Sequence, residues 1–175
     1  MKTKALILLF SAICLQFATF AQQLTLDLLK NSLNYTDEEF AQQLSAKNFK
    51  LIEKDHKNMG DKLINKTEYY SNRTESNTID GNAETAIFYS GKRSKKSLFI
   101  SFSQSMAFGN FNALEDEIKK QLKKEGVFQS EKYDSSILKY SSDKTLFYLF
   151  KEEDTYYIIV SNYPFEDVYF NNKPQ

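Results

Sequence analysis

The amino-acid sequence predicts an α+β protein built from two tandem helix-plus-antiparallel-sheet units, with the helices packed on one side of the sheet. Three observations predict this class. Three segments show the apolar spacing of amphipathic helices, eight short segments rich in Phe, Tyr, Ile and Val indicate strands, and helix and strands follow one another in the same order twice. We place the first unit at residues 22–108 and the second at residues 109–175, within one compact domain.

Residues 1–21 have the pattern of a secretory signal peptide. Two lysines precede an apolar run, and the small residues Thr19 and Ala21 stand where a signal peptidase needs them, so we expect cleavage after Ala21. Cleavage removes Cys14, the only cysteine, and with it disulfides, thiol catalysis and cysteine-bound zinc. We therefore expect a periplasmic or secreted protein with no membrane span after cleavage.

The first two helices are predicted from their caps and apolar spacing. A short helix is expected within Leu24–Leu33. The next begins after Thr36, because Thr36 and Glu39 have the spacing of a capping box, and Phe40 starts its apolar face. Asn48 is a candidate left-handed residue at its end.

The third predicted helix has the clearest apolar stripe. Its members recur every three or four residues: Phe111, Leu114, Ile118 and Leu122. Acidic residues follow its start and lysines crowd its end, as the helix dipole favours, and Glu115 and Lys119 have the spacing of an ion pair. Gly126 is the expected terminator.

Most of the remaining chain indicates strands, because its segments are rich in β-branched and aromatic residues and are divided by short polar turns. The expected strands are Phe49–Lys54, Leu63–Ser71, Glu84–Ser90, Ser97–Ser103, Val127–Tyr133, Ile137–Tyr140, Lys144–Lys151 and Thr155–Asn162. Residues 71–82 are expected to form a long hairpin loop.

The tandem units are predicted from a spacing that recurs in both halves. Three positions in and just after the second helix have counterparts 78 residues later, at the end of the third helix. Phe40 corresponds to Ile118, Leu44 to Leu122 and Asn48 to Gly126. Each half also ends in an aromatic hairpin. Two ordinary αβ segments would produce the same pattern by coincidence, and that alternative stays open.

Adjacent aromatic pairs in the strands predict rings on both faces of the sheet, because neighbouring strand residues point to opposite sides. If the helices cover one face, the other keeps several large rings, which suits recognition of another macromolecule. The candidate binding tyrosines are Tyr89, Tyr148, Tyr157 and Tyr163. The alternative is that these tyrosines are partly buried at strand edges.

Two turns carry opposite charges although the chain has 23 basic and 23 acidic residues. The basic turn contributes Lys92, Arg93, Lys95 and Lys96, and the acidic turn contributes Glu152, Glu153 and Asp154. These turns either keep the strand edges soluble or orient the protein on charged partners or on copies of itself. The balanced total charge does not favour nucleic acid as a partner.

Catalytic and cofactor motifs are largely missing. The five glycines are too widely spaced for a phosphate loop, and His56, the only histidine, lies in a segment that fails the spacing of a calcium loop, so we expect no metal and no cofactor. A carboxylate-pair hydrolase of envelope or environmental polysaccharide remains the enzymatic alternative, since it needs only two acids. The helix starts and the acidic turn already explain most of the acids.

The chain resembles the short exported proteins of Bacteroidota, most of which have no assigned role, in its signal ending Phe17–Gln22 and its Lys-, Asn-, Phe- and Tyr-rich composition. Two successive helix-plus-sheet units are also similar to β-lactamase inhibitory protein, which binds its target with an aromatic sheet face. That resemblance implies a binding role and transfers no individual residue. The inhibitor has disulfides, whereas the chain after Ala21 has no cysteine.

The sequence therefore predicts an exported, non-catalytic protein that binds a protein or a cell-envelope component through tyrosines and charged turns. An inhibitor-like or immunity-like role is one form of this function. An accessory role in envelope assembly is a further alternative.

Overall fold

The computed structural model describes residues 24–59, 62–71, 84–90, 95–103, 110–130 and 134–164. The predicted signal peptide lies outside this part of the chain, and so does the predicted loop over residues 71–82 apart from Ser71, which ends a strand. The described elements are α2 (Leu26–Asn31), α3 (Asp37–Ser45), β1 (Lys50–Met59), β2 (Lys62–Ser71), β3 (Glu84–Ser90), β4 (Lys96–Ser103), α5 (Asn112–Gln121), β5 (Lys123–Ser130), β6 (Ser135–Ser142), β7 (Thr145–Glu152) and β8 (Thr155–Ser161). The α+β class is confirmed.

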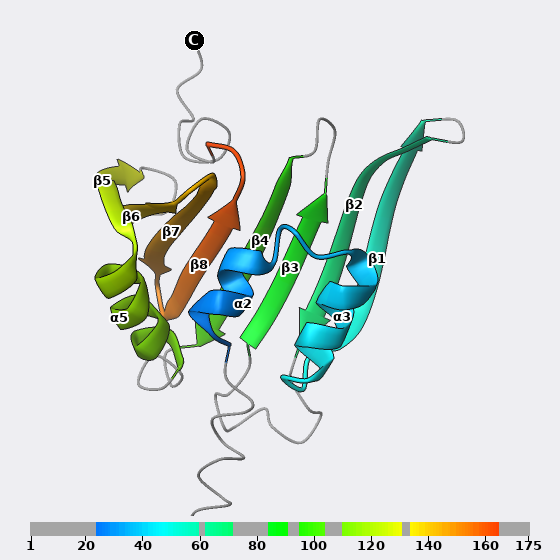
Figure 1. Cartoon of the computed structure of the whole chain (residues 1–175), viewed down its shortest axis with the longest axis horizontal. Coiled ribbons are helices and arrows are strands. Elements are labelled where there is room, and N and C mark those ends of the chain that lie inside the picture. The colour runs from blue at the N-terminus through cyan, green and yellow to red at the C-terminus, as the bar shows by residue number, and fades with distance from the viewer. Residues whose placement is uncertain are drawn as a thin grey trace, which may run out of the picture.

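The strands form one antiparallel sheet in the order β1-β2-β3-β4-β8-β7-β6-β5 (Figure 1). Neighbouring strands are joined by hairpins except at the centre, where β4 pairs with β8. In that pairing Leu98 lies opposite Val160 and Ile100 opposite Ile158. All eight predicted strands are present, but two depart most from the predicted bounds: β1 continues to Met59 instead of ending at Lys54, and β5 starts at Lys123 instead of Val127.

Helix α3 begins where the capping box predicts. The Thr36 side chain accepts a hydrogen bond from the Glu39 backbone N–H, and the Glu39 carboxylate accepts one from the Thr36 N–H. Both pairs satisfy N–H groups that have no partner within the helix. Asn48 adopts a left-handed backbone with φ 63°, as expected after the last turn.

Helix α5 buries the predicted stripe but ends earlier than predicted. The four apolar side chains are at most 8% exposed, and the Lys119 ammonium lies 2.9 Å from the Glu115 carboxylate. The backbone becomes extended at Leu122, and β5 starts at Lys123. The predicted end at Gly126 is therefore wrong, because Gly126 lies inside β5 next to a bulge.

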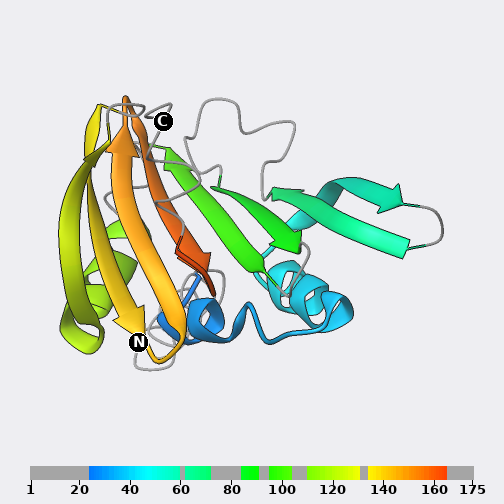
Figure 2. The ribbon, with the colours of Figure 1, turned by 90° about the horizontal axis from the view of Figure 1, so that it is seen from above.

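The helices lie along one side of the sheet (Figure 2), and the main hydrophobic core fills the space between them. Leu29 of α2, Phe40 of α3 and Ile118 of α5 are fully buried there. From the sheet, Phe102 and Phe147 meet them. This burial is the chief stabilising term of the fold, because apolar area removed from water contributes about 25 cal/mol per Å².

The elements of the two halves do not keep the constant spacing of 78 residues. The start of β1 at Lys50 precedes that of β5 at Lys123 by 73 residues, whereas β4 at Lys96 precedes β8 at Thr155 by 59. The 78-residue offset therefore does not hold for these strands.

Candidate functional site

The face of the sheet opposite the helices carries a second apolar cluster. Four of its side chains are buried, namely Ile137, Tyr148, Phe150 and Ile159, and five pack against them while remaining partly exposed, namely Phe99, Phe128, Leu146, Tyr157 and Tyr163. No helix residue in the described ranges belongs to this cluster. We call this side of the sheet the second face.

Two of the predicted tyrosines lie partly open on the second face. The Tyr157 ring stacks on Phe150, with centroids 4.8 Å apart and planes 14° apart. The Lys95 ammonium lies 4.9 Å from the centroid of the Tyr163 ring, which is a cation–π contact. Both rings combine apolar area with a hydroxyl, and Tyr163 also has a positive charge beside it.

The prediction that Tyr148 is an exposed binding residue is wrong. Its side chain is 0% exposed, packed 6.3 Å from Phe128 between centroids, with the Lys139 ammonium 5.7 Å from its ring centroid. The predicted side of the sheet was correct, since Tyr148 does face away from the helices. Burial followed from cross-strand neighbours in β5 and β6, which a single strand does not reveal.

The fourth predicted tyrosine, Tyr89, is placed only through its backbone. It pairs with Thr67 of β2 and with Ser97 of β4. Its side chain lies outside the described part of the structure.

The strand ends next to the two charged turns lie at opposite ends of the β4–β8 pair. Ser97 at the start of β4 pairs with Ser161 at the end of β8, and Ser103 pairs with Thr155 at the start of β8. Lys92 and Arg93 lie outside the described residues. Lys95 and the acidic residues of the other turn are described, and the latter are Glu152, Glu153 and Asp154. Glu153 has a left-handed backbone with φ 48°.

Lys96 was predicted as part of the basic binding turn, and the structure gives it a different place. Its ammonium donates hydrogen bonds to the backbone oxygens of Leu33, at 2.8 Å, and Tyr35, at 3.5 Å. Those oxygens belong to the link between α2 and α3. Lys96 therefore holds this link against the start of β4, a structural contact that the sequence did not predict.

We expect Lys96→Met to lower the free energy of unfolding by about 1–3 kcal/mol, the cost of losing a charged hydrogen bond to partly buried carbonyl groups. Urea unfolding followed by circular dichroism measures this difference. Lys95→Met is the matched control: the adjacent lysine is exposed, and losing its cation–π contact with Tyr163 should cost no more than about 0.5–1 kcal/mol. Equal losses of stability for the two variants would contradict a stabilising role of the Lys96 hydrogen bonds.

A buried ionic network lies between α3 and β2. The Glu68 carboxylate is 1% exposed and accepts from the Lys54 and Lys66 ammonium groups, each at 2.9 Å, and from the Tyr70 hydroxyl at 2.9 Å. Lys66 also contacts the Asp37 carboxylate at the start of α3. Two positive and two negative groups thus balance within one cluster.

The network shifts the pKa values of its members. Burial alone would raise the pKa of Glu68, but hydrogen bonds from Lys54, Lys66 and Tyr70 outweigh it and lower the pKa. Burial would lower the pKa of Lys66, but its hydrogen bonds to Asp37 and Glu68 leave it raised. Burial, followed by the hydrogen bond to Glu68, raises the pKa of Tyr70.

These shifts predict how stability depends on pH. Because the folded pKa of Glu68 is lowered from 4.5, its contribution is complete above pH 4.5 and is lost as the pH falls through the folded value. Because the pKa values of Lys66 and Tyr70 are raised from 10.5 and 10.0, their contributions are complete below pH 10 and are lost at higher pH. Urea unfolding between pH 3 and 11 measures the loss of stability at both the acid and the alkaline end.

The Glu68→Gln variant separates the contribution of Glu68 to acid unfolding from the contributions of the other carboxylates. The stability difference between this variant and the natural protein should narrow as the pH falls below 4.5. A difference that stays constant down to pH 3 would contradict a lowered pKa at Glu68.

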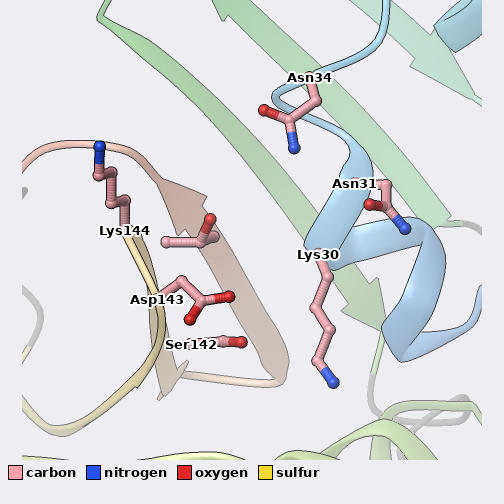
Figure 3. Close-up of a pocket in the computed structure, with 7 residues that line it drawn as sticks. Lys30, Asn31, Asn34, Ser142, Asp143 and Lys144 are labelled. Atoms are coloured by element: carbon pink, nitrogen blue, oxygen red, sulfur yellow. The ribbon is translucent and has the colours of Figure 1, made fainter.

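A polar pocket of about 430 Å³ lies between the end of α2 and the turn joining β6 to β7 (Figure 3). Seven residues line it: Lys30, Asn31, Asn34, Ser142, Asp143, Lys144 and Thr145. Asp143 is its single carboxylate. The carboxylate-pair hydrolase needs two facing acids, so the lining of this pocket does not favour that alternative.

Sequence reasoning missed the ionic network and the pocket. A signal for the network was present, since Lys66, Glu68 and Tyr70 occupy alternate positions of a predicted strand and therefore share a face. No comparable signal exists for the pocket, because Asn34 and Asp143 are brought together only by the tertiary fold.

Comparison with protein-family models, curated proteins and solved structures finds no match. Among the described residues, no helix is long and apolar enough to span a membrane, and no three His, Cys, Asp or Glu side chains gather as metal ligands.

Proposed function

We propose that this chain is an exported, non-catalytic binding protein that docks a protein partner on the second face. The observation that carries the proposal is the set of partly exposed rings on that face, beside which no described helix packs. Residues 1–21, with the pattern of a signal peptide, support export to the periplasm or beyond.

The chemistry of the second face suits a protein partner better than a small ligand. Tyr157 and Tyr163 offer large area with few rotatable bonds, and each ends in a hydroxyl. Phe150 holds the Tyr157 ring by stacking, so little ordering is needed on binding. Lys95, exposed beside Tyr163, adds a positive charge that favours an acidic patch on the partner.

The order of the elements supports the proposed tandem organisation. One helix and four consecutive antiparallel strands, α3 with β1–β4, are followed by a second helix and four more, α5 with β5–β8. The last strands of the two sets pair at the centre of the sheet. A duplicated unit joined edge to edge would produce this order.

Affinity capture with immobilised protein tests the proposal. Extract of the cell envelope is passed over the natural chain, Tyr157→Ala and Tyr163→Ala, and retained proteins are identified by mass spectrometry. We expect one partner whose affinity falls at least tenfold in each variant, since aromatic anchors commonly contribute 2 kcal/mol or more (about 30-fold). Added salt and Lys95→Glu should slow its association.

Ile52→Ala is the control, because Ile52 is an exposed apolar residue of β1, 67% accessible, outside the second-face cluster. It should leave capture unchanged. Retention of the same proteins by all variants, or retention of none by the natural chain, would refute docking on the second face. Circular dichroism of each variant confirms that loss of capture does not reflect unfolding.

A further inference from the structure

The polar pocket is walled by two segments that lie far apart in the sequence. Lys30, Asn31 and Asn34 come from α2 and the residues after it, and the opposite wall is the turn between β6 and β7. In Figure 3 the Asp143 carboxylate and the Lys30 side chain extend into the space between the walls. Ser142 and Thr145 alternate in step with Tyr140 and Phe147 of the main core, so their side chains lie on the helix side of the sheet, away from the second face.

The lining offers hydrogen-bonding groups of every kind. Lys30 and Lys144 donate, Asp143 accepts, and Asn34, Ser142 and Thr145 do both. Within the described residues, the side chains of Asn34, Asp143 and Lys144 make no hydrogen bond or ion pair with another protein group. Lys30 uses one donor on Gln121, at 3.2 Å, and keeps two for a ligand.

The mixture of groups decides the class of ligand. An anion would meet the Asp143 carboxylate, and a cation would meet two ammonium groups, so each would be partly repelled. An apolar molecule would leave the polar groups of the seven lining residues without partners, and a polar ligand satisfies them while its carbon skeleton lies against their aliphatic parts. Hydroxyl groups both donate and accept, and therefore match the carboxylate, the amines and the amide together.

We propose that this pocket binds a neutral saccharide. Its volume of about 430 Å³ falls within the range of small-molecule sites and accommodates one or two sugar rings. The Asp143 carboxylate accepts from sugar hydroxyls, while Lys30 and the Asn34 amide donate to their oxygens. No aromatic ring stacks on the sugar in this lining, so we expect dissociation constants of about 0.1–10 mM.

Nuclear magnetic resonance titration of the full ¹⁵N-labelled chain tests the proposal. The probes are glucose, galactose and N-acetylglucosamine, with inorganic phosphate as the anionic comparison. A bound saccharide should shift the amide signals of residues 30–34 and 142–145 and leave the second face unchanged. Because the two surfaces differ, this experiment and the capture experiment succeed or fail independently.

The Asp143→Asn variant separates the two ligand classes by the sign of its effect. It should weaken saccharide binding about 5- to 10-fold, because a charged acceptor becomes a neutral one. The same change would tighten phosphate binding, since it removes a repulsive charge. Asparagine tolerates the left-handed backbone at this position, where φ is 51°, so the turn is preserved.

The matched control is Asp154→Asn, which makes the same chemical change in the turn at the other end of β7. It should leave saccharide binding unaltered. Localised shifts with phosphate alone, shifts with no probe, or equal effects of the two variants would each overturn the proposal.

Discussion

Replacing Glu68 by alanine should lower the free energy of unfolding by about 3–5 kcal/mol, one of the two largest effects we expect in this protein. The carboxylate is 1% exposed and holds Lys54, Lys66 and Tyr70. Without it, the Lys66 ammonium stays buried with Asp37 as its single described carboxylate partner. Chemical denaturation at neutral pH measures the loss.

Two further variants decide whether the loss comes from the network. Glu53→Ala removes an exposed carboxylate of the neighbouring strand β1 and should change stability by less than about 0.5 kcal/mol. Lys66→Met combined with Glu68→Leu removes the charged pair together, and it should recover most of the loss because no buried ammonium remains. A double variant less stable than Glu68→Ala would contradict this account.

Tyr148→Ala should be comparably damaging, at about 3–5 kcal/mol, although this side chain lies on the second face. The ring is 0% exposed and is enclosed by Phe128, Ile137 and other members of the second cluster. Its removal leaves a cavity the size of a tyrosine side chain. Thermal unfolding and urea titration measure the loss.

Tyr157→Ala is the comparison, because it truncates a tyrosine on the same face that is still partly exposed. Its cost should be smaller, about 1–2 kcal/mol, since part of the ring already contacts water. Equal losses at the two positions would show that the second face is uniformly packed, and this would leave no open aromatic surface for a partner.

Much of the fold could be predicted because it is encoded locally. The capping box at Thr36 and Glu39, the stripe from Phe111 to Leu122, and the strand alternation each depend on residues close in sequence. The end of α5 was missed for the same reason. Lys123 and the residues after it continue a polar helical pattern, and only pairing with β6 makes them a strand.

The candidate site was less predictable, because its geometry depends on contacts between distant strands. Alternation placed Tyr148 and Tyr157 on the same side of the sheet, but exposure depends on neighbours from other hairpins. The sequence around Lys96 predicts a charged residue of a turn, and the backbone oxygen of Leu33 that it binds comes from the distant link between α2 and α3. Side-chain direction is therefore readable from a strand, whereas solvent access is not.

The pairing of β4 with β8 has a consequence for how the molecule matures. It is the only contact between neighbouring strands that joins the first four described strands to the last four, and β8 follows every other described strand in the chain. During synthesis, β4 therefore keeps an unpaired backbone edge until the last hairpin, β7–β8, has been made. In that interval the nascent chain is most exposed to pairing with another molecule, and a chaperone that covers this edge would protect it best.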